Sequence, residues 1–165
     1  MGNKTFDNVE YLKCVIKQRL EDQFLQNWNP LVHNSPKAIN YKTFKTELKY
    51  EEYLNNLEIK DVILFCRFRI KNNKLPIETG RWQNIPRENR KCRLCNKSKI
   101  GDEYHYIFEC IYFNQKRKQS LSNYFIYRHT IIKFSELMLS KRKPMLKKLC
   151  HNISAINTGV CAPAS

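Results

Sequence analysis

The sequence is poor in chain-breaking residues, in acidic residues and in long apolar runs. It holds four glycines and six prolines among 165 residues, and its 15 acidic residues are outnumbered by 30 lysines and arginines. No apolar run is longer than the five residues Val62–Cys66, whereas a membrane-spanning helix needs about 20. The opening residues MGNKTF have no apolar stretch behind them, so we predict neither a secretory signal nor a membrane partner. We expect an intracellular protein, in the nucleus or the cytoplasm.

Patterns typical of an active site are also scarce. Paired carboxylates, a Ser–His arrangement and a glycine-rich phosphate loop are not recognisable in the sequence, and hydrolytic or transfer chemistry needs groups of these kinds. The four aspartates, at positions 7, 22, 61 and 102, are isolated from one another. We therefore predict that this chain is not an enzyme.

Positive charge is concentrated in the C-terminal two thirds of the chain. Residues 1–65 hold 9 basic and 9 acidic groups, residues 66–118 hold 14 and 5, and residues 119–165 hold 7 and 1. A positive field of this kind attracts polyanions, and RNA or DNA is the usual partner of an intracellular basic domain. The simpler alternative is a solvated surface that happens to be basic.

The apolar residues recur mostly with helical spacing. One face of a first helix is marked by five apolar residues at intervals of three or four, namely Val9, Leu12, Ile16, Leu20 and Phe24. This helix is predicted to end before Pro30. Similar patterns predict helices within residues 41–57, 58–70 and 112–127, and a last helix that begins near Pro144. Strand signals are weak, so the predicted fold class is mainly α.

Seven cysteines are present, and without a secretory signal we expect thiols and not disulfides. Four potential metal ligands lie within 19 residues in the pattern C-x2-C-x9-H-x4-C, namely Cys92, Cys95, His105 and Cys110. Three cysteines and one histidine are a common ligand set for a closed, tetrahedral structural zinc site. A tight turn can point the first two sulfurs inward, and Asp102 can cap a short helix that carries the histidine. The alternative is a group of unrelated buried thiols.

These patterns divide the chain into four parts. We predict a near-neutral helical region (1–74), a basic zinc-binding segment (75–112), a C-terminal helical region (113–157) and a frayed tail (158–165). Within the irregular zinc-stapled insert, residues 91–99 form at most a short β-hairpin. The length fits one small domain, which we expect to be a monomer.

A wider set of residues accompanies the four ligands. It comprises Phe68, Arg69, Leu75, Ile77, Glu78, Gly80, Arg81, Trp82, Pro86, Arg90, Asp102 and Glu103. Upstream stand Tyr41-Lys-Thr-Phe44-Lys45 and Tyr53-Leu54, and downstream stands Phe134–Met138. Together these features, over about residues 38–150, resemble the C-terminal zinc-binding region of non-LTR retrotransposon reverse transcriptases.

The resemblance implies a function and partners. In that family the region follows an endonuclease and a polymerase on one polyprotein, and it is thought to hold template RNA or target DNA during target-primed reverse transcription. It implies zinc ligation by the four residues of the C-x2-C-x9-H-x4-C pattern, and RNA, DNA or the polymerase domain as partners. The paired aspartates of the polymerase are absent from this sequence, which therefore resembles the tail of such a polyprotein without its enzymes.

We expect basic side chains and aromatic rings near the zinc site to contact nucleic acid. The charge candidates, which would neutralise phosphates, are Arg81, Arg87, Arg90, Lys91, Arg93, Lys97 and Lys99. The ring candidates, which would stack on unpaired bases, are Trp82, Tyr104 and Tyr106. Three alternatives stay open: Trp82 fills the core, Arg81 pairs with Glu78, and at least one tyrosine packs on the metal site. The rival function is a zinc-stapled structural or protein-interaction domain that does not touch nucleic acid.

Overall fold

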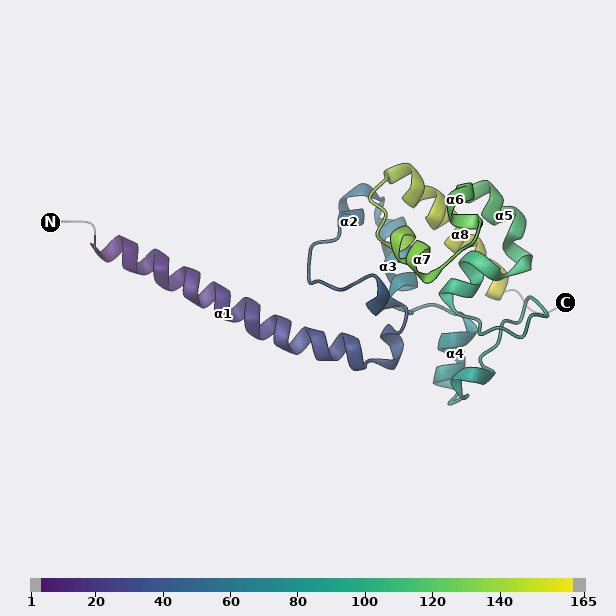
Figure 1. Cartoon of the computed structure of the whole chain (residues 1–165), viewed down its shortest axis with the longest axis horizontal. Helices are drawn as coiled ribbons and strands as arrows, with labels where there is room; N and C mark the ends of the chain where they lie inside the picture. Colours follow the sequence, from purple (N-terminus) through teal and green to yellow (C-terminus); the bar gives the residue numbers. More distant parts are fainter. Residues whose placement is uncertain (1–3, 162–165) are drawn as a thin grey trace. The chain divides into compact units, whose positions relative to one another are not determined.

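The chain folds into helices joined by turns and irregular segments (Figure 1). The computed structural model describes residues 4–161, and side chains from Asn8 onward. Within that range there is no strand, and a single antiparallel bridge joins Lys91 and Ile100. The predicted mainly α class is confirmed. The chain forms two compact units, residues 1–39 and 40–165, so the first unit is shorter than the region 1–74 predicted from composition.

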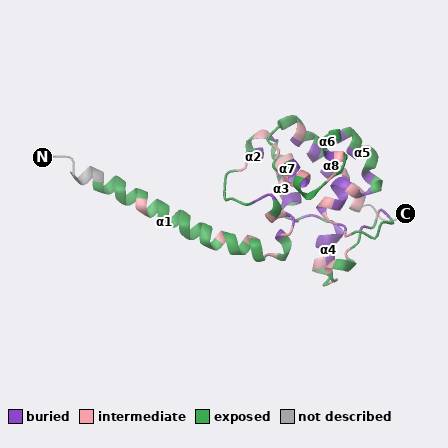
Figure 2. Ribbon diagram, viewed as in Figure 1, coloured by how far each residue is buried: buried purple, intermediate pink, exposed green. Residues whose placement is uncertain are grey.

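The first unit consists of helix α1, Lys4–Asn34, followed by the short 3₁₀ turn η1, Pro36–Ala38. The prediction that this helix ends before Pro30 is wrong, because α1 continues to Asn34. Proline removes one backbone hydrogen bond, but its restricted φ is a helical value, so a helix can continue through it at a cost. The predicted apolar face is present, and its five residues are all more than half exposed. Figure 2 shows the ribbon of α1 mostly in green, the colour of exposed residues.

The second unit holds the remaining elements. Its α-helices are α2 (Tyr53–Asn56), α3 (Ile59–Arg69), α4 (Pro76–Trp82), α5 (Asn114–Ser120), α6 (Asn123–Ile126), α7 (Ile131–Met138) and α8 (Lys143–Cys161). Its shorter turns are η2 (Tyr41–Thr43), η3 (Arg87–Asn89), η4 (His105–Glu109) and η5 (Ile111–Phe113).

The core of this unit forms where α8 packs against α3 and α5. Phe65 and Phe68 of α3, with Leu149 and Ile153 of α8, are at most 1% exposed, and Phe134 of α7 joins the same cluster. Figure 2 shows these buried stretches in purple on α3, α7 and α8. The residues of η4 enter this core as well, which ties the candidate metal ligands to the main body of the unit.

Two predicted helix boundaries in the C-terminal part are wrong. The helix expected over residues 112–127 is interrupted at Leu121, which adopts an extended conformation and is only 5% exposed. Burying that side chain requires the chain to leave the α5 direction before α6 begins. The first four residues of the tail predicted to fray (158–165) instead continue α8 as far as Cys161, and residues 162–165 lie outside the described residues. At Gly159 an added Cβ would lie 2.9 Å from the Phe113 ring, so the helix end packs closely on the core.

The helical pattern of residues 41–57 forms only at its two ends, as η2 and α2, because the residues between them turn inward to meet Arg69. The guanidinium carbon of Arg69 lies 4.9 Å from the ring centres of both Phe44 and Tyr53. Its Nη1 donates to the Glu51 carboxylate at 3.0 Å, and Lys45 pairs with the same carboxylate. Arg69 is only 3% exposed, so this long-range contact outweighs the local helical preference.

The charge cluster at Glu51 predicts a pH-dependent loss of stability on substitution. Burial alone would raise the pKa of Glu51, but hydrogen bonds from Lys45 and Arg69 outweigh it and lower the pKa. A lowered folded-state pKa adds stability above the ordinary value of 4.5, and this stability disappears as the pH falls through the lowered pKa. We expect Glu51→Gln to lower the free energy of unfolding by about 1–2 kcal/mol at pH 7.

Urea denaturation at pH 7 and at about pH 3 checks this expectation. The difference between wild type and Glu51→Gln should shrink at the lower pH. Glu47→Gln is the matched control, because Glu47 pairs with Lys49 at an exposed position. An equal difference at both pH values would contradict the charge interaction.

Candidate metal centre

The segment that carries the first two cysteines is folded back on itself by two backbone hydrogen bonds. The N–H of Cys92 donates to the carbonyl of Lys99 at 2.8 Å, and the N–H of Gly101 donates to that of Arg90 at 2.8 Å. The predicted hairpin is therefore limited to one bridge without strands. At Gly101 an added Cβ would lie 2.9 Å from Pro76 and 3.2 Å from the backbone N of Cys92, so only glycine fits this close approach.

The other two candidate ligands flank an unusually wide turn. The Asp102 carboxylate accepts the N–H of His105 at 3.0 Å, which confirms the predicted cap. Residues His105–Glu109 then form the π-helical turn η4, and the N–H of Cys110 donates to the carbonyl of His105 at 2.8 Å. A turn with this five-residue hydrogen bond is wider than an α-helical turn, and it returns Cys110 to the side of His105.

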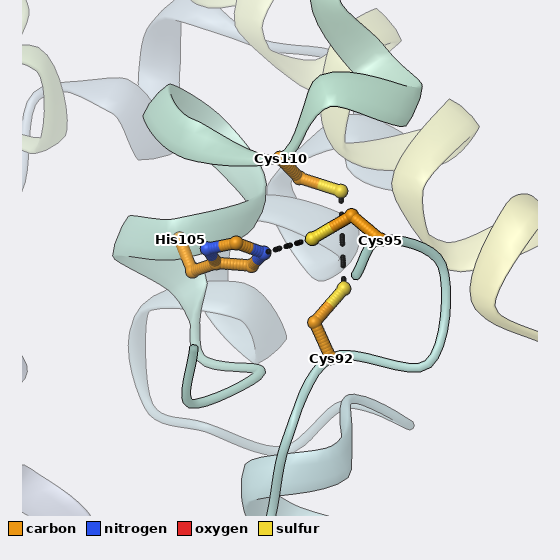
Figure 3. Close-up of side chains that lie close together, drawn as sticks. All are labelled: Cys92, Cys95, His105 and Cys110. Atoms are coloured by element: carbon orange, nitrogen blue, oxygen red, sulfur yellow. Dashed lines mark hydrogen bonds between the residues drawn. The ribbon is translucent and has the colours of Figure 1, made fainter. Parts of the chain in front are cut away.

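The four candidate ligand atoms converge on one point (Figure 3). Three sulfurs and the imidazole Nε2 all lie within 4.8 Å of one another. The sulfurs of Cys92 and Cys110 are 3.8 Å apart, and the Cys95 sulfur is 3.4 Å from Nε2 of His105. All four residues are buried, with exposed fractions of 9% or less. The cluster could therefore hold a metal ion, and its thiolate and imidazole donors suit a borderline or soft transition metal.

The histidine of the cluster is oriented by a carboxylate. The Nδ1 of His105 lies 3.2 Å from the carboxylate of Glu109, one turn further along, and this leaves Nε2 facing the Cys95 sulfur. A carboxylate on the second nitrogen is the usual partner of a metal-ligating histidine, because it sets the tautomer and the direction of the ring.

A buried arginine supports the same turn from the core side. Arg117 of α5 is 4% exposed. Its Nε donates to the carbonyl of Ile107 at 2.6 Å and its Nη2 donates to that of Cys110 at 2.8 Å. The Cys110 carbonyl also accepts the N–H of Phe113 at 3.3 Å, whereas the Ile107 carbonyl relies on Arg117, and a buried carbonyl without a donor is costly. Arg117 therefore connects α5 to the backbone of two residues beside the cluster.

A buried carboxylate holds the beginning of the turn. Glu103 is 2% exposed and accepts hydrogen bonds from the side-chain amides of Asn40, at 2.9 Å, and Asn73, at 3.2 Å. Burial raises the pKa of Glu103. The oxygen of the Asn73 amide accepts the N–H of Leu75 at 3.1 Å, so one network joins the segments before α4 and before η4.

Without a metal ion, the cluster retains protons that a metal would displace. The pKa of Cys92 is lowered, chiefly because its sulfur takes part in a hydrogen bond with Cys110, whose own pKa is raised by the same contact. Burial alone would lower the pKa of His105, but hydrogen bonds with Cys92 and Glu109 raise it to about 9. Metal binding requires thiolates and a neutral imidazole, so it is linked to proton release.

The basic residues predicted to contact nucleic acid divide into two groups. Exposed side chains without a carboxylate partner in the described part of the chain are Lys91, Arg93, Lys97 and Lys99. The other three contact the protein itself. Arg81 pairs with Glu78, as the alternative interpretation held, and Arg87 lies 3.8 Å from the Asp102 carboxylate. Arg90 is half-buried and donates to the carbonyls of Ile85 (2.7 Å) and Ile77 (3.1 Å), so it connects two parts of the segment.

The three predicted stacking rings are also placed differently from one another. Tyr106 is fully buried, so its ring cannot stack on a base, and the prediction is wrong for this residue because the wide turn directs it into the core. Tyr104 is half-buried and packs edge-on against Phe108 and Phe134. Trp82, for which a core position was the alternative, is 56% exposed.

Two residues that support the site, Glu109 and Arg117, were not predicted from the sequence. Glu109 stands four residues after His105, and this helical spacing could have indicated it. Arg117 has no such local signal, because its partners are backbone carbonyl groups of the wide turn.

No protein-family model matches the sequence, and no curated protein or solved structure matches it either. Among the described residues, no helix is both long and apolar enough to cross a bilayer.

Proposed function

We propose that this chain is a zinc-organised nucleic-acid-binding module, equivalent to the tail of a non-LTR retrotransposon reverse transcriptase that holds template RNA or target DNA. The observation that carries the proposal is the buried convergence of Cys92, Cys95, His105 and Cys110. The spacing in the sequence did not show whether the four residues lie together. Their convergence supports the resemblance, because a zinc-binding pattern requires it.

The geometry of the cluster fits zinc. A tetrahedral site with zinc–sulfur bonds of about 2.3 Å places two sulfurs about 3.8 Å apart, and the Cys92 and Cys110 sulfurs are 3.8 Å apart. With four protein ligands such a site is closed, so the ion would be structural and not catalytic. Its chemistry would be to hold the segment between Cys92 and Cys110 in one conformation.

The nucleic acid would be attracted by the exposed basic side chains of that segment. Lys91, Arg93, Lys97 and Lys99 are exposed on the loop that the first two ligands anchor. A loop held by a metal presents its cations in a defined arrangement, so less conformational entropy is lost when phosphates bind. Phosphate neutralisation would supply affinity without sequence preference.

The rival function, a protein-interaction module, is favoured by helix α1. Its apolar face, with Ile16 57% exposed and Leu20 61% exposed, is the kind of contiguous apolar surface that often marks a protein contact. The polymerase domain of the same polyprotein is the partner that the resemblance implies. The two functions can coexist, because α1 and the basic segment lie in different units.

Salt dependence of binding distinguishes the two functions. If about five phosphates of duplex DNA are neutralised, the slope of log K against log salt is expected near −4.5. The triple variant Arg93→Ala, Lys97→Ala, Lys99→Ala should make the slope shallower by about 2.7 and weaken binding to all sequences alike. Gel-shift titrations of the zinc-loaded protein at several salt concentrations measure both.

A charge-matched control is the triple variant Lys13→Ala, Lys17→Ala, Arg19→Ala in α1, which removes the same charge from the near-neutral unit. It should leave the slope almost unchanged. A slope near zero for wild type would show that the positive field is incidental and would favour the protein-interaction function.

A further inference from the structure

A groove away from the metal cluster is lined by α3, α4, α8 and the segment between α3 and α4. Its volume is about 720 Å³, and its lining includes Trp82, Arg67, Lys74, Ile63 and Asn157. Neither Arg67 nor Lys74 takes part in the metal centre. The groove is therefore a separate surface of the second unit.

The indole of Trp82 is the most distinctive group in this groove. Trp82 is the last residue of α4 and is 56% exposed. Within residues 8–161 its ring makes none of the aromatic or cation–π contacts that the other rings of this unit form. A large planar ring that is left exposed beside a groove can accept a second planar group on its face.

The charge of the groove selects an anionic ligand. Lys60, Arg67 and Lys74 line it, and no acidic residue does. Lys60 is paired with Glu58 at 3.1 Å, whereas Arg67 and Lys74 have no carboxylate partner among the described residues. An acidic or phosphorylated ligand would thus gain two free cations, while a basic or neutral peptide would not.

Two side-chain amides with unused hydrogen-bonding groups also line the groove. Asn72 is exposed, and its side chain makes no hydrogen bond within the described chain. The Oδ1 of Asn157 is shielded from solvent and has no donor in the described part of the structure. A side-chain amide can donate and accept at the edge of a nucleobase, so both groups could pair with a base after a rotamer change.

We propose that this groove holds an unpaired nucleotide of a single strand, with the base stacked on Trp82 and the phosphates beside Arg67 and Lys74. Stacking rings next to a cationic track are the usual means by which proteins hold single strands without strict sequence preference. The inference rests on the proposed function and deepens it, because it predicts a preference for single strands over duplexes. A duplex keeps its bases stacked on one another and offers no free face to the indole.

Binding to a 20-nucleotide single strand and to the duplex of the same sequence tests the inference. By fluorescence anisotropy, Trp82→Ala should weaken single-strand binding of the zinc-loaded protein by about 10-fold or more and duplex binding by less than about 2-fold. Trp82→Phe, which keeps a ring, should restore most of the affinity. Tyr127→Ala is the control, because Tyr127 is an aromatic residue outside the groove that is 69% exposed.

A second readout does not depend on substituting Trp82. The sequence has two tryptophans, so in a Trp28→Phe variant all indole fluorescence comes from Trp82. We expect the single strand to quench this fluorescence at the concentration where anisotropy saturates. Absence of quenching would overturn the inference even if Trp82→Ala failed to fold.

The outcomes separate the inference from the proposed function. Single strands could bind Trp82→Ala as tightly as wild type while the Arg93, Lys97, Lys99 variant loses affinity. In that case the inference about the groove is wrong and the proposed function stands. If wild type binds neither nucleic acid, both fail. Quenching by an acidic peptide but not by the oligonucleotide would overturn the inference that the groove binds a nucleotide. It would show instead that the groove binds a protein segment.

Discussion

Removal of the proposed zinc ion is expected to unfold residues 91–110 and to loosen the core beside them. Structural zinc in small domains contributes roughly 10–16 kcal/mol of binding free energy, which exceeds what this polar segment can gain by burying apolar surface. The loss should spread, because Tyr106, Ile107 and Phe108 of the same turn are at most 3% exposed in the main core. Chelator treatment should therefore increase protease cleavage within the segment and lower the melting temperature.

Substitution of a single candidate ligand tests the same expectation that loss of the metal unfolds residues 91–110. Cys95→Ser should abolish stoichiometric zinc binding and reproduce the protease sensitivity of the chelated protein. Cys14→Ser is the control for loss of a thiol, because Cys14 is exposed on α1 and lies outside the cluster. Metal content by mass spectrometry and limited proteolysis measure both effects. Unchanged cleavage of the segment after chelation would contradict a structural metal.

Replacing Arg117 by methionine is expected to be the next most damaging change. The variant removes the Arg117 donors from the carbonyls of Ile107 and Cys110. The Cys110 carbonyl keeps the N–H of Phe113 at 3.3 Å, whereas the Ile107 carbonyl is left buried without its donor, which costs about 1–3 kcal/mol. We therefore expect the free energy of unfolding to fall by about 1–3 kcal/mol. Because Cys110 is also a candidate ligand, zinc affinity should fall about 10- to 100-fold, as for other groups that orient metal ligands.

Denaturation by urea and competition with a chromophoric chelator measure the two effects of Arg117→Met separately. Lys118→Met is the matched control, because Lys118 is the exposed neighbour on the same helix. Zinc affinity equal to that of wild type would show that Arg117 supports the fold without orienting the cluster.

The four candidate ligands could be predicted from sequence because their chemistry depends on short intervals. Two residues between Cys92 and Cys95 imply a tight turn, and an aspartate three residues before His105 implies a cap, whatever surrounds them. The wide turn between His105 and Cys110 could not be predicted, since π-helical turns are rare and have no simple residue pattern.

Features that depend on contacts between distant residues could not be predicted from the sequence. Trp82 and Tyr106 stand in similarly mixed surroundings, yet one is exposed and the other fully buried, because the packing of remote helices decides which ring is covered. The same holds for the residues between η2 and α2, where the contact of Phe44 with Arg69 replaces a locally favoured helix. Periodicity correctly indicated an apolar face on α1, but it does not show what covers that face.

The π-helical turn also has a consequence for how sequences of this type could diverge. Residues 96–98 of the loop after Cys95 are exposed, so insertions there would change its length without moving a ligand. Between His105 and Cys110, losing one residue would shift the thiol by one position around the wide turn, away from the imidazole. Descendants of this chain should therefore vary in the first interval and keep four residues in the second.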